Sequence, residues 1–266
     1  MERAGLAPQN DLVVNPCPTV AGTIEFITVG SDGNLNFWLI DRKLDSSDEN
    51  HKKHHAPALP AELLGTHWTT ATYTDGNVKG YDSVVLILGS IDGHLSAYDP
   101  AKEEFVEGGA KRRVRKAQVG CMQVSRGTTV VVASSDGSIY RYPIGGKRGT
   151  VLPAEDADST TVLVKEVCPD LSVAVVSLSM DQGNESGICG TNDGSLHYFT
   201  FEDTRPCIPL VRKLSPGLEN CNYLRHVPDG TSNVLLAALG EGAGSVKLYT
   251  AINLDEIVSF DQKGAR

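Results

Sequence analysis

The sequence predicts an all-β fold made of about five repeats of a four-stranded unit. One short pattern recurs five times along the 266 residues: an apolar run, a small residue, a glycine-containing turn that is Asp-Gly in four copies, and an alternating run with an aromatic residue. The marker glycines of successive copies lie 60, 44, 57 and 50 residues apart. This spacing is typical of four strands with their turns, so we favour a repeat protein over an irregular β-sandwich with several Asp-Gly turns.

The pattern has the same internal phase in every copy. The copies read VGSDGNLNFW, GSIDGHLSAY, ASSDGSIYRY, GTNDGSLHYF and GEGAGSVKLY, with marker glycines Gly33, Gly93, Gly137, Gly194 and Gly244. Two positions later comes an aliphatic residue: Leu35, Leu95, Ile139, Leu196 or Val246. Five positions later comes an aromatic residue: Trp38, Tyr98, Tyr142, Phe199 or Tyr249. A strand that begins directly after the turn explains this phase.

Each copy predicts a β-hairpin. Asp-Gly between two apolar runs is the strongest short-range hairpin signal, because the turn that matches strand twist needs positive φ at its central residues. The incoming strands, FITVG, VVLILG, VVVAS, GICGT and LLAALG, are almost wholly apolar. We therefore expect them to be covered on both faces, between stacked sheets. The turn aspartates lack the alternating carboxylates that a calcium loop needs.

Two weaker strands flank each hairpin. The first strands are expected at 11–15, 68–73, 117–124, 172–180 and 222–227. The last strands are expected at 62–65, 161–167, 208–212 and 256–260. Four strands in a repeat of this length form the blade of a β-propeller, and each blade buries its faces by stacking on its neighbours.

The predicted organisation is an N-terminal tail, 1–10, followed by a propeller, 11–262. The blades are placed approximately at 11–67, 68–110, 111–168, 169–213 and 214–262, with a polar insertion at 44–60. Propellers usually close with one blade built from both chain ends, and no such split blade is visible. We therefore expect an incomplete, open part of a larger propeller or one completed by a partner, with terminal blades available for self-association; a closed five-bladed ring is the alternative.

The repeats resemble a degenerate WD40 repeat: apolar strand, small residue, Asp-Gly, alternating strand and aromatic residue. Only Tyr98 is followed by the aspartate of the family pattern, Asp99, and the Gly-His pair upstream is absent. The stretches DLVVNP, EFITVGSDGNLNFWLIDRK, LPAELLG and VVSLSMDQGNESGICGTNDGSLHYFTF, and the closing blade through EIVSF, are similar to a propeller of the centriole and basal-body WD-repeat scaffold proteins. The tubulin-binding module and further blades of that family are missing, so the resemblance does not by itself carry microtubule binding over.

Composition and charge exclude several classes of function. The net charge of −9 disfavours binding to nucleic acid or to an anionic membrane surface. The N-terminal residues lack the apolar core of a secretory signal, and the longest aliphatic stretch is far too short for a membrane span, so we expect a cytoplasmic protein. The six cysteines have no zinc or redox spacing and are expected to be reduced and mostly buried.

One cluster of positive charge stands out against this acidic background. It consists of Lys111, Arg112, Arg113, Arg115 and Lys116. Such a run could bind an acidic tubulin tail or another phosphate-rich or acidic partner, and it is the candidate partner-binding patch. The alternative is a solvated loop or an edge strand whose charges discourage pairing with another sheet.

No catalytic, cofactor-binding or metal site is predicted. His51, His54 and His55 in the polar insertion could bind a transition metal, but a surface loop between strands is the favoured interpretation. The motifs of serine hydrolases, P-loop and dinucleotide-binding proteins and zinc proteases are absent. A five-bladed lectin or glycosidase, with carboxylates or aromatic residues in the central channel, stays the enzymatic alternative.

The predicted function is a non-enzymatic protein-interaction scaffold without cofactors. The resemblance implies a setting in the centriole, basal body or ciliary axoneme, with tubulin or centriolar and axonemal scaffold components as partners. A subunit of another assembly, such as a nuclear-pore or transport complex, is the second interpretation. Because fold does not fix function, the partner-facing surfaces should lie in the loops.

Overall fold

The computed structural model describes residues 9–18, 21–30, 32, 34–41, 52–74, 84–114, 118–125, 129–145, 151–152, 160–163, 174–180, 186–192, 194–201, 210–213, 223–228, 233–238, 245–250 and 254–261. The chain divides into two compact units, 1–130 with 142–158 and 131–141 with 159–266. The described residues form strands and short 3₁₀ helices and contain no α-helix. No helix in this part of the chain combines the length and hydropathy needed to cross a membrane.

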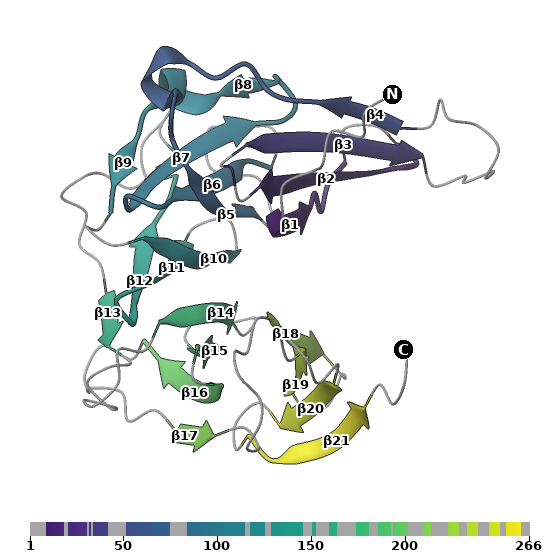
Figure 1. The fold of residues 1–266 in the computed structure, drawn as a ribbon, viewed down its shortest axis with the longest axis vertical. Coiled ribbons are helices and arrows are strands. Elements are labelled where there is room, and N and C mark those ends of the chain that lie inside the picture. Colours follow the sequence, from purple (N-terminus) through teal and green to yellow (C-terminus); the bar gives the residue numbers. More distant parts are fainter. Residues whose placement is uncertain are drawn as a thin grey trace. The chain divides into compact units, whose positions relative to one another are not determined.

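Five antiparallel sheets follow one another along the chain, and within each sheet the strands pair in chain order (Figure 1). The first sheet contains β1 (Gln9–Val14), β2 (Thr23–Gly30), β3 (Leu35–Asp41) and β4 (Lys52–His55). The second contains β5 (Trp68–Tyr73), β6 (Leu86–Ser90), β7 (His94–Asp99) and β8 (Glu104–Phe105), and β9 (Arg112–Arg113) also pairs with β7. The third contains β10 (Val119–Ser125), β11 (Thr129–Ser134), β12 (Ser138–Pro143) and β13 (Thr160–Leu163).

The last two sheets repeat the arrangement. The fourth contains β14 (Val175–Met180), β15 (Ser186–Thr191), β16 (Ser195–Thr200) and β17 (Leu210–Lys213). The fifth contains β18 (Tyr223–Pro228), β19 (Asn233–Ala238), β20 (Ser245–Thr250) and β21 (Glu256–Asp261). The predicted all-β fold of five repeated sheets is confirmed.

The predicted hairpins are present, but their turns differ from the expected type. Gly93, Gly137 and Gly194 have φ of +80°, +82° and +80°, whereas neither Asp92 nor Asp136 has positive φ. The amide of each glycine donates to the carbonyl three residues before it, as in Gly93 N to Ser90 O at 3.2 Å. The turns are therefore three-residue loops with one left-handed glycine, and the expectation of positive φ at the aspartates was wrong.

The side chains of the turn aspartates stabilise the hairpin turns through hydrogen bonds to the backbone. Asp136 Oδ1 accepts the amide hydrogen of Ser138 at 3.0 Å, and Asp32 Oδ1 accepts that of Asn34 at 3.0 Å. Such a bond to the backbone two residues later is the usual contribution of aspartate to a tight turn. The hydrogen bonds from the backbone and side chain of Asn34 also lower the pKa of Asp32.

The repeated apolar positions build the core, as the strand pattern predicts. Leu95, Ile139 and Leu196 have no exposed surface, and four of the five marker aromatics are buried: Tyr98, Tyr142, Phe199 and Tyr249. The incoming strands are also enclosed, since Leu86, Ile87 and Leu88 of β6 are all at 0% exposure. Successive residues of a strand point to opposite faces, so complete burial means that both faces of β6 are covered.

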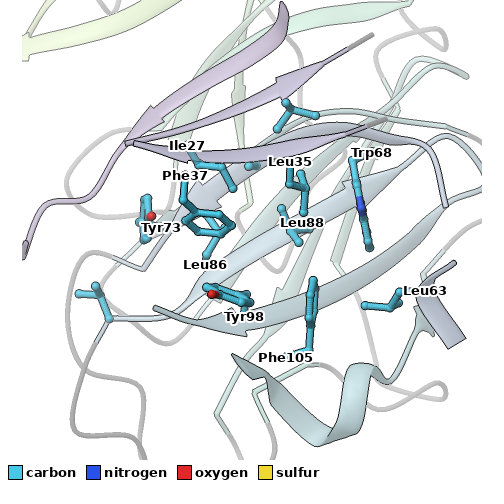
Figure 2. Close-up of a cluster of buried hydrophobic side chains, with 13 residues drawn as sticks. Ile27, Leu35, Phe37, Leu63, Trp68, Tyr73, Leu86, Leu88, Tyr98 and Phe105 are labelled. Atoms are coloured by element: carbon cyan, nitrogen blue, oxygen red, sulfur yellow. The ribbon is translucent and has the colours of Figure 1, made fainter. Parts of the chain in front are cut away.

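In the first unit the core lies between the first and second sheets (Figure 2). Ile27 and Leu35 approach it from the first sheet, and Leu86 and Leu88 from the second. The Phe37 ring lies 4.7 Å from the Tyr98 ring, measured between centroids. These contacts are those of stacked propeller blades, in which one sheet supplies the cover for the next.

Hydrogen bonds between first strands join successive sheets. The carboxylate of Asp11 on β1 accepts bonds from Thr70 Oγ1 (2.8 Å) and from the amide of Ala71 (3.0 Å), both on β5. Thr69 Oγ1 bonds to the carbonyls of Gly89 (3.1 Å) and Val119 (2.5 Å), which lie on β6 and β10. Register shifts occur at the corresponding places of β1, β5 and β14, next to Asp11, Thr70 and Ser177. Strand-period reasoning does not reveal such irregularities.

The last strand of the first sheet was misplaced. The expected strand 62–65 overlaps a 3₁₀ helix, Ala61–Leu63, whose Leu63 is completely buried against the core. The sheet ends instead on β4, Lys52–His55, inside the expected polar insertion 44–60. An outermost strand needs a partner on one side only, so a polar sequence such as KKHH can form it.

Candidate protein-interaction surfaces

The basic segment lies at the edge of the second sheet. In β9, Arg112 pairs with Leu95 and Arg113 with His94 of β7. Lys111 is partly buried and Arg113 is exposed, whereas Arg115 and Lys116 lie outside the described residues. Residues 112–113 therefore form an edge strand, as one of the two interpretations of the cluster expected. Partner binding by the cluster stays a prediction.

Arg112 is held by an internal partner. Its guanidinium lies 2.9 Å from Glu107 Oε2, and the side chain of Arg112 is only one-third exposed. The other oxygen, Oε1, accepts the amide hydrogen of Val151 at 3.0 Å. Glu107 has an unusual positive φ of 55°, which is a strained backbone conformation for a residue other than glycine. Its carboxylate joins the segments that contain Arg112 and Val151. Arg112 is thus a structural residue at this edge, and the exposed charge of β9 comes from Arg113.

Backbone hydrogen bonds join the segments around His67 and Val114 to the β6–β7 turn, and the three segments together form a rim. The amide of Ile91 donates to the carbonyl of His67 (3.0 Å), and Gly93 O accepts the amide of Val114 (3.0 Å) directly after β9. Ile91 is 54% exposed, and Leu64, three residues before His67, is 66% exposed. We define the rim surface as Leu64, Ile91 and Arg113. Exposed aliphatic and arginine side chains on a rigid support are typical of protein-binding surfaces.

Two groups of residues resemble catalytic arrangements but are structural. In the β6–β7 turn, Asp92 lies between Ser90 Oγ (2.5 Å) and His94 Nδ1 (2.9 Å), so the histidine is not placed to take a proton from the serine. Partial burial opposes ionisation of Asp92, but its bonds to Ser90 and His94 outweigh this and lower its pKa.

The second group joins the fourth and fifth sheets. Ser179 Oγ lies 2.7 Å from His226 Nδ1 and also accepts the backbone amide of His226 at 2.8 Å. Ser179 is only 3% exposed, so a substrate could not reach its hydroxyl. The pair fastens β14 to β18.

Only two of the three histidines of the polar segment lie within the described residues. His54 and His55 belong to β4, and His51 lies outside the described residues. Within the described ranges, no group of three or more histidine, cysteine, aspartate or glutamate residues could hold a metal ion. Cys17, Cys121 and Cys189 are free thiols; Cys17 is exposed, and burial raises the pKa of Cys121.

The first sheet carries an apolar surface of the kind that the sequence predicts for the terminal blades of an open propeller. The cross-strand register places Val14, Phe26 and Trp38 side by side on the face opposite the core. Leu12, Val14 and Ile24 are 57%, 52% and 37% exposed. We call this surface the outer face of the first sheet; its apolar residues are Leu12, Val14, Ile24, Phe26, Trp38 and Ile40. The register pairs Trp38 with His54 and Ile40 with Lys52 of β4. The apolar residues on both faces of β2 are the sequence signal for this surface.

The comparisons with known proteins concern the fold. No family model matches the chain, and no curated protein matches it in sequence. Among solved structures, 1415 chains match, a number that indicates a widespread fold. One of them is the β-propeller domain of Cps50 (Swd1) from Myceliophteria thermophila, with a TM-score of 0.64 over 92% of this chain and 70% of that chain. This chain is a β-propeller. The sequence identity is 12%, so the likeness establishes the propeller fold and carries no function with it.

Proposed function

We propose that this propeller is a non-enzymatic scaffold that binds other proteins through its exposed rim. The rim surface is the observation that carries the proposal. There, two aliphatic side chains that are more than half exposed, Leu64 and Ile91, lie on segments that backbone hydrogen bonds fix to one hairpin, together with the β9 segment. A surface held in this way loses little conformational entropy on binding, which favours recognition of a protein partner.

The bonding of the polar turn residues supports the same proposal. Ser90, Asp92 and His94, the group closest to hydrolytic chemistry, bond to one another in an order that stabilises the turn. The buried strands supply the core, and the turns present side chains to the solvent. A rigid core with variable exposed connections is suited to positioning partners.

The resemblance to centriole and basal-body scaffold proteins supplies the proposed setting. We place the protein in the cytoplasm, at a centriole, basal body or ciliary axoneme, with tubulin or other structural components as partners. Proximity labelling and imaging of the tagged full chain test this setting. Enrichment of centriolar or axonemal proteins is expected; a diffuse distribution with no such enrichment contradicts it.

A paired variant tests the rim itself. The double variant Ile91→Ser and Arg113→Glu should remove most of the labelled partners, because it takes away an aliphatic contact and reverses an exposed charge. Ser135 occupies the equivalent position of the β11–β12 turn, so Ser135→Glu is the matched control and should leave labelling unchanged. Equal labelling by both variants contradicts a role for the rim surface, whatever the cellular setting.

A further inference from the structure

A serine and a histidine join the fourth and fifth sheets. Their first strands, β14 and β18, pack against each other and belong to one compact unit (Figure 1). Ser179 Oγ on β14 lies 2.7 Å from Nδ1 of His226 on β18, and the same oxygen accepts the amide hydrogen of His226 at 2.8 Å. One hydroxyl group therefore binds both the backbone and the side chain of a residue in the next sheet.

The directions of these hydrogen bonds fix the charge state of His226. A hydroxyl group has one hydrogen to donate. Ser179 Oγ accepts the amide hydrogen of His226, and the described residues give this oxygen no further hydrogen bond besides that to Nδ1. Ser179 is only 3% exposed, so its hydrogen needs an acceptor within the protein. Nδ1 is that acceptor, which requires a neutral imidazole with its hydrogen on Nε2.

A second proton on the imidazole reverses the side-chain bond. Protonated histidine carries a hydrogen on both ring nitrogens, so Nδ1 then donates to Ser179 Oγ instead of accepting from it. The hydroxyl hydrogen of Ser179 loses its acceptor in a buried position, and an unsatisfied buried donor is destabilising. His226 itself is partly exposed, so a proton from the solvent can reach the ring. The joint therefore fits only the neutral form of the histidine.

The strands around His226 supply no negative charge that would offset the proton. β18 packs mainly against β14, β15 and β19, and Cys189 on β15 is the one titratable residue of these three described strands. Its thiol is buried. Within β18 the other titratable or charged residues are Tyr223 and Arg225, and Arg225, the neighbour of His226, points to the opposite face of the strand. None of these four strands contains a carboxylate to stabilise a protonated His226.

We propose that the Ser179–His226 pair is a pH-sensitive joint, which holds the fifth sheet to the fourth while His226 is neutral and loosens when His226 is protonated. Histidine is the side chain that ordinarily changes charge between about pH 5 and 8. The folded joint binds the proton less readily than the unfolded chain, so the unfolded state takes up more protons as the pH falls. The stability that the joint contributes is therefore present above about pH 6.5 and decreases as the pH falls below it. This inference goes beyond the scaffold function, because the joint lies within the propeller and needs no partner.

The joints between the earlier sheets respond to pH differently. The second and third sheets are joined by the bond from Thr69 Oγ1 to the carbonyl of Val119, in which neither group titrates. The first and second sheets are joined through Asp11, and burial raises the pKa of its carboxyl group. The contribution of Asp11 therefore decreases as the pH rises, which is the opposite direction. A loss of stability on acidification that is located at β18 distinguishes His226 from both.

Hydrogen exchange of the purified full chain between about pH 7.5 and 5.5, measured by mass spectrometry, tests the proposal. Peptides that contain β18 include the amide of His226, which is bonded to Ser179. After correction for the intrinsic effect of pH on amide exchange, their protection should fall by about five- to ten-fold over this range. The limit of about ten-fold applies to one histidine that titrates near pH 6.5 when unfolded and takes up no proton when folded. Protection of β18 that stays constant overturns the proposal.

Two variants separate the pair from its surroundings. His226→Asn places an amide oxygen near the position of Nδ1, so it can accept the Ser179 hydroxyl hydrogen but cannot titrate. It should keep most of the protection of β18 at pH 7.5 and remove the fall toward pH 5.5. Ser179→Ala removes the hydroxyl group, so it should lower the protection already at pH 7.5 and flatten the same profile. A fall that persists in His226→Asn belongs to another group and overturns the proposal.

His67→Asn is the matched control. It makes the same replacement at an exposed histidine of the other compact unit, so the pH profile of β18 should stay that of the parent. A profile that His67→Asn flattens as much as His226→Asn does overturns the assignment to His226. These measurements use the purified chain alone, so their failure is distinguishable from a failure of the rim surface to recruit cellular proteins.

Discussion

Gly89 should not tolerate a methyl group, because the second and third sheets meet at its backbone. A Cβ at this position would lie 2.6 Å from Val119 Cγ1 and 3.1 Å from Thr70 Cγ2. In Gly89→Ala, β6 and β10 would have to separate by several tenths of an ångström. That movement also strains the bonds from Thr69 Oγ1 to the carbonyls of Gly89 and Val119.

The expected loss follows from three contributions. Overpacking costs about 1–3 kcal/mol. A weakened hydrogen bond adds about 1 kcal/mol. Alanine also reduces the conformational freedom of the unfolded chain, which offsets about 0.4–1 kcal/mol of this loss. We expect the free energy of unfolding of Gly89→Ala to fall by about 2–3 kcal/mol, which lowers the melting temperature by about 4–12 °C.

A double-mutant cycle in chemical denaturation separates crowding from other causes. Val119→Ala removes the methyl group that the new Cβ would strike, so Gly89→Ala should cost at least 1 kcal/mol less in that background. Gly22→Ala is the control, since a Cβ there meets no atom within 4 Å and its cost arises from φ of +84°. Its cost should not depend on residue 119. Strict additivity of Gly89→Ala and Val119→Ala would refute the argument from crowding.

Three further predictions concern other positions. Leu95→Ala should lower the free energy of unfolding by about 2–5 kcal/mol in denaturant titrations, because Leu95 is fully buried. Leu12→Ala, at a residue 57% exposed, should change it by less than about 0.5 kcal/mol in dilute solution, and equal effects would contradict the burial assignment. Gly137→Ala should cost about 1–2 kcal/mol because of its φ of +82°, and a neutral result would show that the turn can change its conformation. Burial raises the pKa of Asp11 above its ordinary 3.8, even though its carboxylate accepts hydrogen bonds. The contribution of Asp11 to stability should therefore decrease as pH rises from 3.8 through the folded-state pKa. Asp11→Asn should remove that slope in urea titrations across this range; an unchanged slope would exclude Asp11 as its source.

Local patterns were sufficient to predict most of the fold. Turn residues and apolar alternation act over a few neighbours. The strand 68–73 therefore coincides with β5, and the repeated positions are buried with the exception of Trp38 and Val246. The same reasoning failed at β4, whose polar sequence pairs with β3, a strand separated from it by residues 42–51 of the chain. It also misjudged the φ angles of the aspartates, because turn type depends on how the two strands meet.

The candidate surfaces depended on contacts distant in sequence. The five basic residues were found from charge alone, but only the structure shows that Arg112 is bound to Glu107 while Arg113 remains exposed. The rim surface arises because the β6–β7 turn bonds to His67 and Val114, which flank it at a distance along the chain. No local pattern encodes such a meeting.

The sequence by itself determined that this protein repeats one four-stranded unit and that its marker aliphatic residues, four of the five of which are buried, belong to its core, because strand periodicity and turn chemistry are local properties. Tertiary structure decided which faces of those strands are covered. The sequence of β2 is apolar on both faces, yet Ile27 is enclosed while Ile24 on the opposite face remains partly exposed. Burial depends on the presence of a neighbouring sheet, and the free energy gained from an apolar face is realised only when another surface removes it from water.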